Sequence, residues 1–164
     1  MEQCSFDTLK RALTAALVLL VWDSSRTTRL ITNSSELAVG SILEQPDNQG
    51  AWHPVAFESR KLTIQERSYP PHCLELLAVV HSLCAFRLYL LDKPFKLHTD
   101  NASLQWLNQQ LLVSHHHARW LDTIGEFAFT IIHIPGSTNP ADFLSSMCFS
   151  SGTEPAQTAG YTDN

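Results

Sequence analysis

The fold is decided by one stretch, which reads PPHCLELLAVVHSLCAFRLYLL at residues 70–91. Two prolines open it, and proline is favoured at the first position of a helix because the amide hydrogen it lacks would have no partner there. The apolar residues that follow run too long for a strand and are interrupted by few charges. We therefore predict one long helix over residues 72–91, buried on most of its sides.

Three strand-like stretches precede this helix. They cover residues 28–33, 37–44 and 52–58, and the last two are separated by PDNQG at 46–50, which is dense in turn-forming residues. The pattern predicts an antiparallel meander. The motif TIQE at 63–66 has the spacing of a helix capping box.

Strands and helices alternate after the long helix. The pattern predicts strands at 95–99 and 128–134, helices at 102–108 and 115–127, and a last helix capped by Asn139 with Pro140 at its first position. This order of elements predicts an α/β domain over residues 28–147. We expect a lead-in at residues 1–27 and a disordered polar tail at 148–164.

Composition fits one folded domain. Of 164 residues, 44% are hydrophobic and 16% are charged, and the formal net charge is -5. A negative net charge argues against overall electrostatic attraction to nucleic acid, but acidic residues that hold cations lower the net charge in the same way. Composition therefore leaves the partner open. The four cysteines are scattered, which favours free thiols and no zinc site.

The lead-in holds an apolar run at residues 12–22. It is too short to span a membrane, and acidic residues before it do not suit a secretion signal. We predict a short helix from Ser5, β structure at 18–21, and an intracellular protein that is not secreted and has no membrane partner.

Three carboxylates are candidates for a catalytic or metal-binding site. Glu75 is the only carboxylate between Glu66 and Asp92, and burying it is costly unless a cation or a partner such as Arg119 or His72 neutralises it. Asp100 ends the strand at 95–99, where it could bind a ligand or cap the next helix. Asp142 lies in the first turn of the last helix, where it could serve a site or only offset the helix dipole.

A series of short motifs links these carboxylates. The motifs are TNSS at 32–35, GSIL at 40–43, FESRKL at 57–62, YP at 69–70, ELLAVV at 75–80, RLYLL at 87–91, TDNASL at 99–104, RWL at 119–121, IPG at 134–136 and NPADFLS at 139–145. In order and spacing they resemble the RNase H domain of gypsy-type long-terminal-repeat retrotransposon reverse transcriptases. The resemblance covers about residues 6–146.

The resemblance implies a fold and a reaction. The family has an RNase H-like fold, a five-stranded mixed sheet flanked by helices, and it hydrolyses the RNA strand of RNA–DNA hybrids with two magnesium ions held by four carboxylates. Glu75, Asp100 and Asp142 match three of those ligands, and manganese is an alternative metal. The resemblance further implies a polymerase domain supplied by a parent polyprotein.

The fourth ligand position departs from the family. Where the family has an aspartate that bridges the two metals, this chain has Asn33, and an amide offers a neutral oxygen in place of an anion. We predict weakened metal binding and impaired cleavage. The alternative is a catalytically inactive module, domesticated or a remnant, that binds nucleic acid or is structural.

Several other residues are candidates for contacting the substrate or assisting its cleavage. His133 lies where the family has an aromatic residue, and it could assist proton transfer or product release, or merely pack. Asn101, Arg60, Lys61 and Arg119 could contact the hybrid, whose recognition rests on backbone shape more than on bases. The run of histidines at 115–117 is not a metal site, because adjacent helical residues point in different directions.

Overall fold

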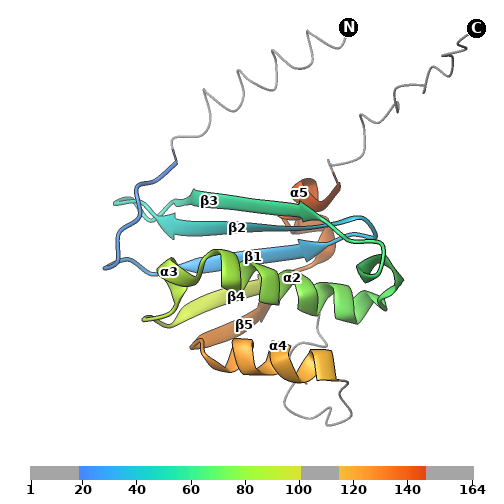
Figure 1. The fold of residues 1–164 in the computed structure, drawn as a ribbon. Coiled ribbons are helices and arrows are strands. Elements are labelled where there is room, and N and C mark those ends of the chain that lie inside the picture. The colour runs from blue at the N-terminus through green and yellow to red at the C-terminus, as the bar shows by residue number, and fades with distance from the viewer. Residues whose placement is uncertain (1–18, 101–114, 147–164) are drawn as a thin grey trace, which may run out of the picture.

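The computed structural model describes residues 19–100 and 115–146 (Figure 1). These form five strands and four α-helices with two short 3-10 turns, in the order predicted from the sequence. The strands are β1 (Arg29–Ser34), β2 (Ala38–Pro46), β3 (Trp52–Lys61), β4 (Phe95–Thr99) and β5 (Phe129–His133). The helices are α2 (Pro71–Ala85), α3 (Arg87–Leu90), α4 (His115–Gly125) and α5 (Asp142–Ser146), and the 3-10 turns are η1 (Glu66–Ser68) and η3 (Gly136–Thr138).

All five strands form one sheet in the order β3-β2-β1-β4-β5. The first three strands pair antiparallel, whereas β1 with β4 and β4 with β5 pair parallel, so the sheet is mixed as predicted. The predicted turn between β2 and β3 is present. Asp47 Oδ1 accepts the amides of Gln49 and Ala51, and Gly50 adopts a φ of 86°, which other residues rarely do.

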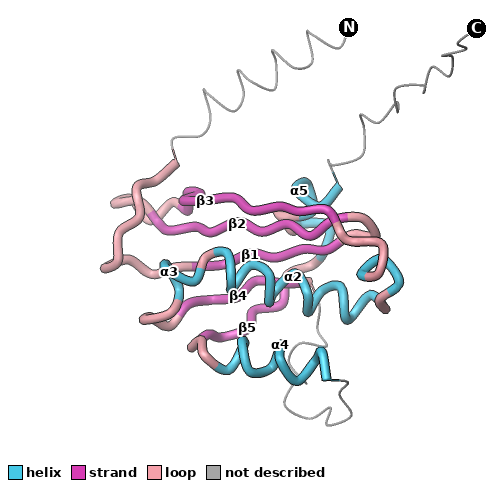
Figure 2. Tube along the Cα trace, in the orientation of Figure 1, coloured by secondary structure: helices cyan, strands magenta, loops and turns pink. Residues whose placement is uncertain are grey.

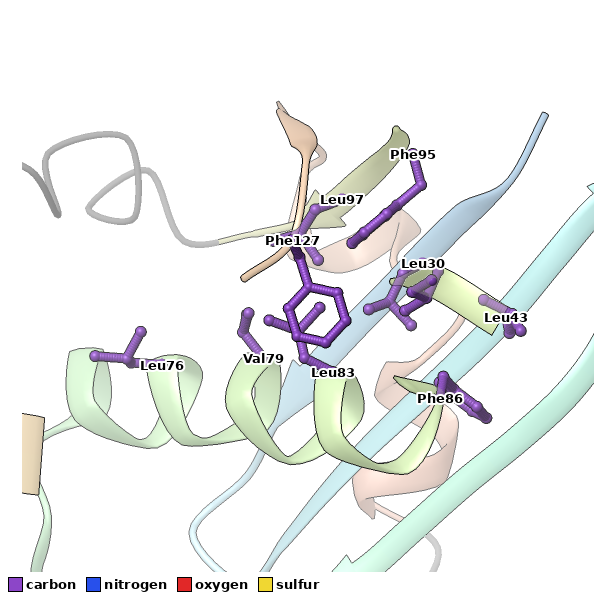
Figure 3. Close-up of a cluster of buried hydrophobic side chains, with 10 residues drawn as sticks. Leu30, Leu43, Leu76, Val79, Leu83, Phe86, Phe95, Leu97 and Phe127 are labelled. Carbon is purple, nitrogen blue, oxygen red and sulfur yellow. The ribbon is translucent and has the colours of Figure 1, made fainter. Parts of the chain in front are cut away.

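Helices cover both faces of the sheet (Figures 1 and 2). Leu30 packs in the cluster beneath α2, and the next residue, Ile31, packs with Ala141 and Leu144 near α5. Because successive strand residues point to opposite faces, α2 and α5 lie on opposite sides of β1. Figure 3 shows the α2 side, where buried residues from strands and helix meet. The main cluster comprises Leu30, Leu43, Leu76, Val79, Leu83, Phe86, Leu90, Phe95, Leu97 and Phe127.

The long helix predicted over residues 72–91 is interrupted. Helix α2 ends at Ala85, and Phe86, with φ −98° and ψ 18°, separates it from α3. This break allows the Phe86 ring to enter the core, where it is 4% exposed, and Tyr89 to contact Trp22 of the lead-in edge to face. Periodicity cannot detect it, because apolar residues continue on both sides.

The β structure predicted at 18–21 is wrong for the described residues 19–21. One backbone hydrogen bond, from the Leu20 amide to the Pro54 carbonyl, joins this segment to β3, and Val21 is 87% exposed. The chain is instead fixed two residues later. The buried Gln45 amide pairs with both backbone polar groups of Asp23.

The predicted helix caps are present. Thr63 and Glu66 exchange the hydrogen bonds of a capping box, although the helix they open is only the short turn η1. Asn139 Oδ1 accepts the Ala141 amide 3.0 Å away, but α5 begins at Asp142, so the prediction that Pro140 is the first residue of this helix is wrong.

Three other predicted segments cannot be compared with the structure. The helices expected from Ser5 and at 102–108 lie outside the described residues, and so does the tail at 148–164. The domain boundaries therefore stay predictions. Across residues 19–100 and 115–146, none of the helices combines the length and apolar character needed to cross a bilayer.

Candidate active site at the carboxyl ends of β1 and β4

The sheet brings Asn33 and Asp100 to the same edge. Asn33 is the fifth residue of β1 and Asp100 directly follows β4, its parallel neighbour. The register ends with the pair Ile31 and His98, and Asn33 and Asp100 each follow that pair by two residues. Carboxyl ends of parallel strands are a common place for functional groups.

Asn33 is bonded directly to Asp142. Its Nδ2 donates to Asp142 Oδ1 at 3.1 Å and to Ser145 Oγ at 2.7 Å, while its Oδ1 lies 3.5 Å from Nδ2 of Asn139. Asn33 is 3% exposed and Ser145 is fully buried. The amide thus presents hydrogens, not an oxygen lone pair, toward the carboxylate that the sequence predicted as a metal ligand.

Glu75 reaches the same edge from α2. Its Oε1 accepts a hydrogen bond of 2.5 Å from Ser34 Oγ, so its partner is Ser34 and not the Arg119 or His72 considered from the sequence. Burial raises the pKa of Glu75 to about 7, and the negative charge of Asp100 adds to the rise, while the hydrogen bond from Ser34 opposes it. Glu75 and Asp100 therefore lie close enough to influence each other.

Two buried oxygens face this site without a hydrogen bond from any described residue. They are Glu75 Oε2 and Asp100 Oδ1. A Cβ built on Gly136 would lie 3.1 Å from Asp100 Oδ2, so a side chain at this position would require Asp100 to shift by a few tenths of an ångström. His133 also contacts Asp100, because its Nε2 lies 2.9 Å from the Asp100 carbonyl oxygen, and its side chain is exposed and not packed in the core.

These residues only partly suit a pair of metal ions. The unpartnered oxygens of Glu75 and Asp100 fit one cation, because buried carboxylate oxygens without partners favour such binding. Asn33 and Asp142 do not fit a second in this arrangement, since the Asn33 NH₂ group binds Asp142 and the Asn33 oxygen points to Asn139. Over residues 19–100 and 115–146, no group of three or more His, Cys, Asp or Glu side chains is arranged to hold a metal.

The predicted substrate contacts that the structure describes lie on β3 and α4. Arg60 binds Glu66 through both terminal nitrogens, at 2.8 and 2.9 Å, so its charge is already paired. Lys61 is exposed at the end of β3, and Arg119 is exposed on α4. Asn101 lies outside the described residues.

Sequence reasoning missed two residues of the site, Ser34 and Ser145. Both lie inside motifs that were recognised, but a serine hydroxyl gives no signal of its partner until the fold places Ser34 below α2 and Ser145 beside Asn33. Only the position of Ser145 three residues after Asp142, on the same helix face, hinted at a shared role.

A family model matches this chain, and curated relatives match it too, among them two transposon polyproteins. The model, described as the RNase H-like domain found in reverse transcriptase, matches residues 23–127. The retrovirus-related Pol polyprotein from transposon 297 of Drosophila melanogaster is 34% identical over 142 residues, which is 86% of this chain and 13% of that protein. The transposon Tf2-3 polyprotein of Schizosaccharomyces pombe is 33% identical over 146 residues, again 86% of this chain and 11% of that protein. The chain thus spans a small part of these relatives.

Solved structures share the fold. The foamy viral protease-reverse transcriptase in complex with RNA/DNA hybrid gives a TM-score of 0.59 at 17% identity, covering 84% of this chain and 19% of that chain. LC11-RNase H1 in complex with RNA/DNA hybrid gives 0.52 at 14% identity, covering 72% of this chain and 91% of that chain. Both likenesses confirm the RNase H-like fold predicted from the motifs. By the family model and the transposon relatives together, this chain belongs to the family of RNase H-like domains found in reverse transcriptases.

Proposed function

We propose that this chain is the RNase H-like domain of a retrotransposon polyprotein that binds RNA–DNA hybrids and cleaves their RNA strand only weakly. One observation carries the proposal: Asn33 Nδ2 donates to Asp142 Oδ1 at 3.1 Å. The proposal includes a polymerase domain elsewhere in the parent polyprotein and an intracellular location.

Weak cleavage follows from the charges at the site. In two-metal nucleases the ions activate the attacking water and stabilise the leaving oxygen, and they require anionic oxygens on both sides. Here Glu75 and Asp100 retain buried oxygens without partners, but Asp142 Oδ1 is occupied by the Asn33 amide. Magnesium or manganese would therefore be held by Glu75 and Asp100 more weakly than by a complete set of ligands.

Two lines of evidence support the binding of an RNA–DNA hybrid. Foamy viral protease-reverse transcriptase and LC11-RNase H1 share this fold, and both have structures in complex with RNA/DNA hybrid. Among the residues predicted to contact the hybrid, Lys61 and Arg119 are exposed cations that could approach a phosphate backbone.

A cleavage assay tests the proposal. Labelled hybrid would be incubated in magnesium or manganese with the chain, with Asn33→Asp, and with Asn33→Asp combined with Asp100→Asn. We expect Asn33→Asp to cleave at least about 100-fold faster than the chain itself, since even outer-shell partners of metals contribute up to about that factor. The double variant should return to background. Equal rates for the chain and Asn33→Asp would refute the proposal.

A second candidate is a non-catalytic nucleic-acid-binding module. It is favoured by the lack of a three-residue metal cluster among the described residues. It predicts that Asn33→Asp restores neither cleavage nor tight magnesium binding in a calorimetric titration, while the chain still binds hybrid. Restored cleavage would exclude it.

A further inference from the structure

Helix α5 depends on the sheet for its position. It has five residues, Asp142–Ser146, and a helix of that length is not stable alone in water. Apart from Asn33, two serines reach it from the sheet side. Ser35 Oγ donates to the Ser145 carbonyl at 2.9 Å, and Ser59 Oγ donates to the Leu144 carbonyl at 3.2 Å.

The backbone of α5 lies directly against β2. A Cβ built on Gly40 would be 2.7 Å from Leu144 Cβ and 3.1 Å from the Ser145 amide nitrogen. The contact leaves no space for a shift of α5 toward the sheet. Ala141, fully buried just before α5, fills the remaining gap against Ile31 and Ile42.

Asn33 makes the buried polar link in this contact. It bonds to two different residues of α5, Asp142 and Ser145, and Asn139 approaches its oxygen from the preceding loop. An aspartate in its place would have no hydrogen to donate to either residue, and its carboxylate would face that of Asp142. A divalent cation between the two carboxylates would be needed to offset their repulsion.

We propose that Asn33 is a positioning residue that holds α5 on the sheet as a bridging cation would, so that the position of α5 in this chain does not depend on divalent cations. The proposal concerns Asn33, Asp142 and Ser145 alone, and it stands whether or not the chain cleaves hybrids.

Thermal unfolding with and without cations tests this role. We expect millimolar manganese or magnesium to raise the Tm of the chain only slightly above its value in EDTA, through weak cation binding at Glu75 and Asp100 alone. In EDTA, Asn33→Asp should unfold at least about 5 °C lower, because the buried hydrogen bond to Asp142 is lost and two carboxylates face each other. Manganese should raise the Tm of Asn33→Asp clearly more than it raises the Tm of the chain. A merely structural role would give no such cation response.

Two matched variants sharpen the result. Asn33→Asp combined with Asp142→Asn again pairs one amide with one carboxylate, so it should regain most of the lost Tm in EDTA. Asn33→Ala should lose stability in EDTA and not regain it with manganese. The proposal fails if Asn33→Asp is as stable as the chain in EDTA, or if manganese raises both Tm values equally.

Hydrogen exchange on the unchanged chain gives an answer even if a variant does not fold. The Leu144 and Ser145 amides, which bond to the Ala141 carbonyl, report on α5. Their exchange should be unchanged by manganese. Marked slowing would mean that a cation still orders α5, and it would overturn the proposal.

Discussion

At position 33 a single nitrogen changes what a buried side chain can do. An aspartate offers only acceptors, whereas Asn33 donates to Asp142 and Ser145. These bonds join the last helix to the central strand, and they also remove Asp142 Oδ1 from the oxygens open to a cation. The residue that weakens the proposed chemistry is thus the one that orders the site.

Glu66 gives a pH dependence that is separate from the candidate site. Hydrogen bonds from Arg60 are the main reason that the pKa of Glu66 falls from its ordinary 4.5 to about 2. Because the folded-state pKa is lowered, this stabilisation is complete above about pH 4.5 and is lost as the pH falls toward 2. We expect Glu66→Gln to lower the free energy of unfolding by about 1 kcal/mol at neutral pH, after allowance for solvent screening of a partly exposed pair.

Urea titrations at about pH 7 and about pH 2 measure this difference. The gap between the chain and Glu66→Gln should shrink at the lower pH. Glu36→Gln, in the exposed loop between β1 and β2, serves as the control and should change little at either pH. A gap that is equally large at both values would show that the Glu66 charge is not responsible.

At the scale of elements, the core beneath α2 carries much of the stability. Leu83 is fully buried there, whereas Leu88, two residues beyond the break at Phe86, is 96% exposed. We expect Leu83→Ala to lower the free energy of unfolding by about 2 to 5 kcal/mol, and Leu88→Ala to change it by less than about 0.5 kcal/mol. Denaturant unfolding compares the two, and similar losses would contradict the placement of α3.

The contact of β2 with α5 makes a second prediction at this scale. Gly40→Ala would force a Cβ against Leu144 and should cost about 1 to 3 kcal/mol of stability. Gly125→Ala, with no atom within 4 Å of the added Cβ, is the matched control and should be neutral or slightly stabilising. If Gly40→Ala leaves the Tm unchanged, α5 does not pack as closely as described.

Element types were predictable because each has its own local signal. Strand-like stretches bounded by turn-forming residues mark β1 to β3, the Pro70-Pro71 pair marks the start of α2, and Asn139 marks the approach to α5. The break at Phe86 was not predictable, because it depends on a ring entering a core that other elements build. The segment before Asp23 was wrongly predicted as β structure. Its position is set by hydrogen bonds between Asp23 and the side chain of Gln45, which is distant in sequence.

At the scale of the whole molecule, the motifs predicted a mixed sheet and indicated four candidate site residues, Asn33, Glu75, Asp100 and Asp142. The topology brings these residues to one edge of the sheet. The direction of the Asn33 amide and the partner of Glu75 needed the structure, because both depend on contacts between residues far apart in sequence. Sequence spacing gives which residues share an edge, but not which atoms face each other.

The last prediction concerns which positively charged side chains contact the hybrid. Arg87 is already paired with Glu126 at 2.5 Å, whereas Arg119 is exposed on α4. If Arg119 meets a phosphate, Arg119→Ala should weaken hybrid binding and reduce the slope of log affinity against log salt by about 1. Arg87→Ala is the control and should leave that slope unchanged. Fluorescence anisotropy over a salt series measures both, and equal slopes for all three proteins would remove Arg119 from the interface.

The bond between Asn33 and Asp142 joins residues 109 positions apart, and this affects how the chain comes together during synthesis. The meander of β1 to β3 consists of sequence neighbours and can form while the ribosome is still making the rest. Ile31 and Ile42 stay on an uncovered face of the sheet until Ala141, which packs against them, has been synthesised. A nascent chain stopped before residue 141 would therefore expose an apolar sheet face to chaperones, and the candidate site is the last part of the domain to be assembled.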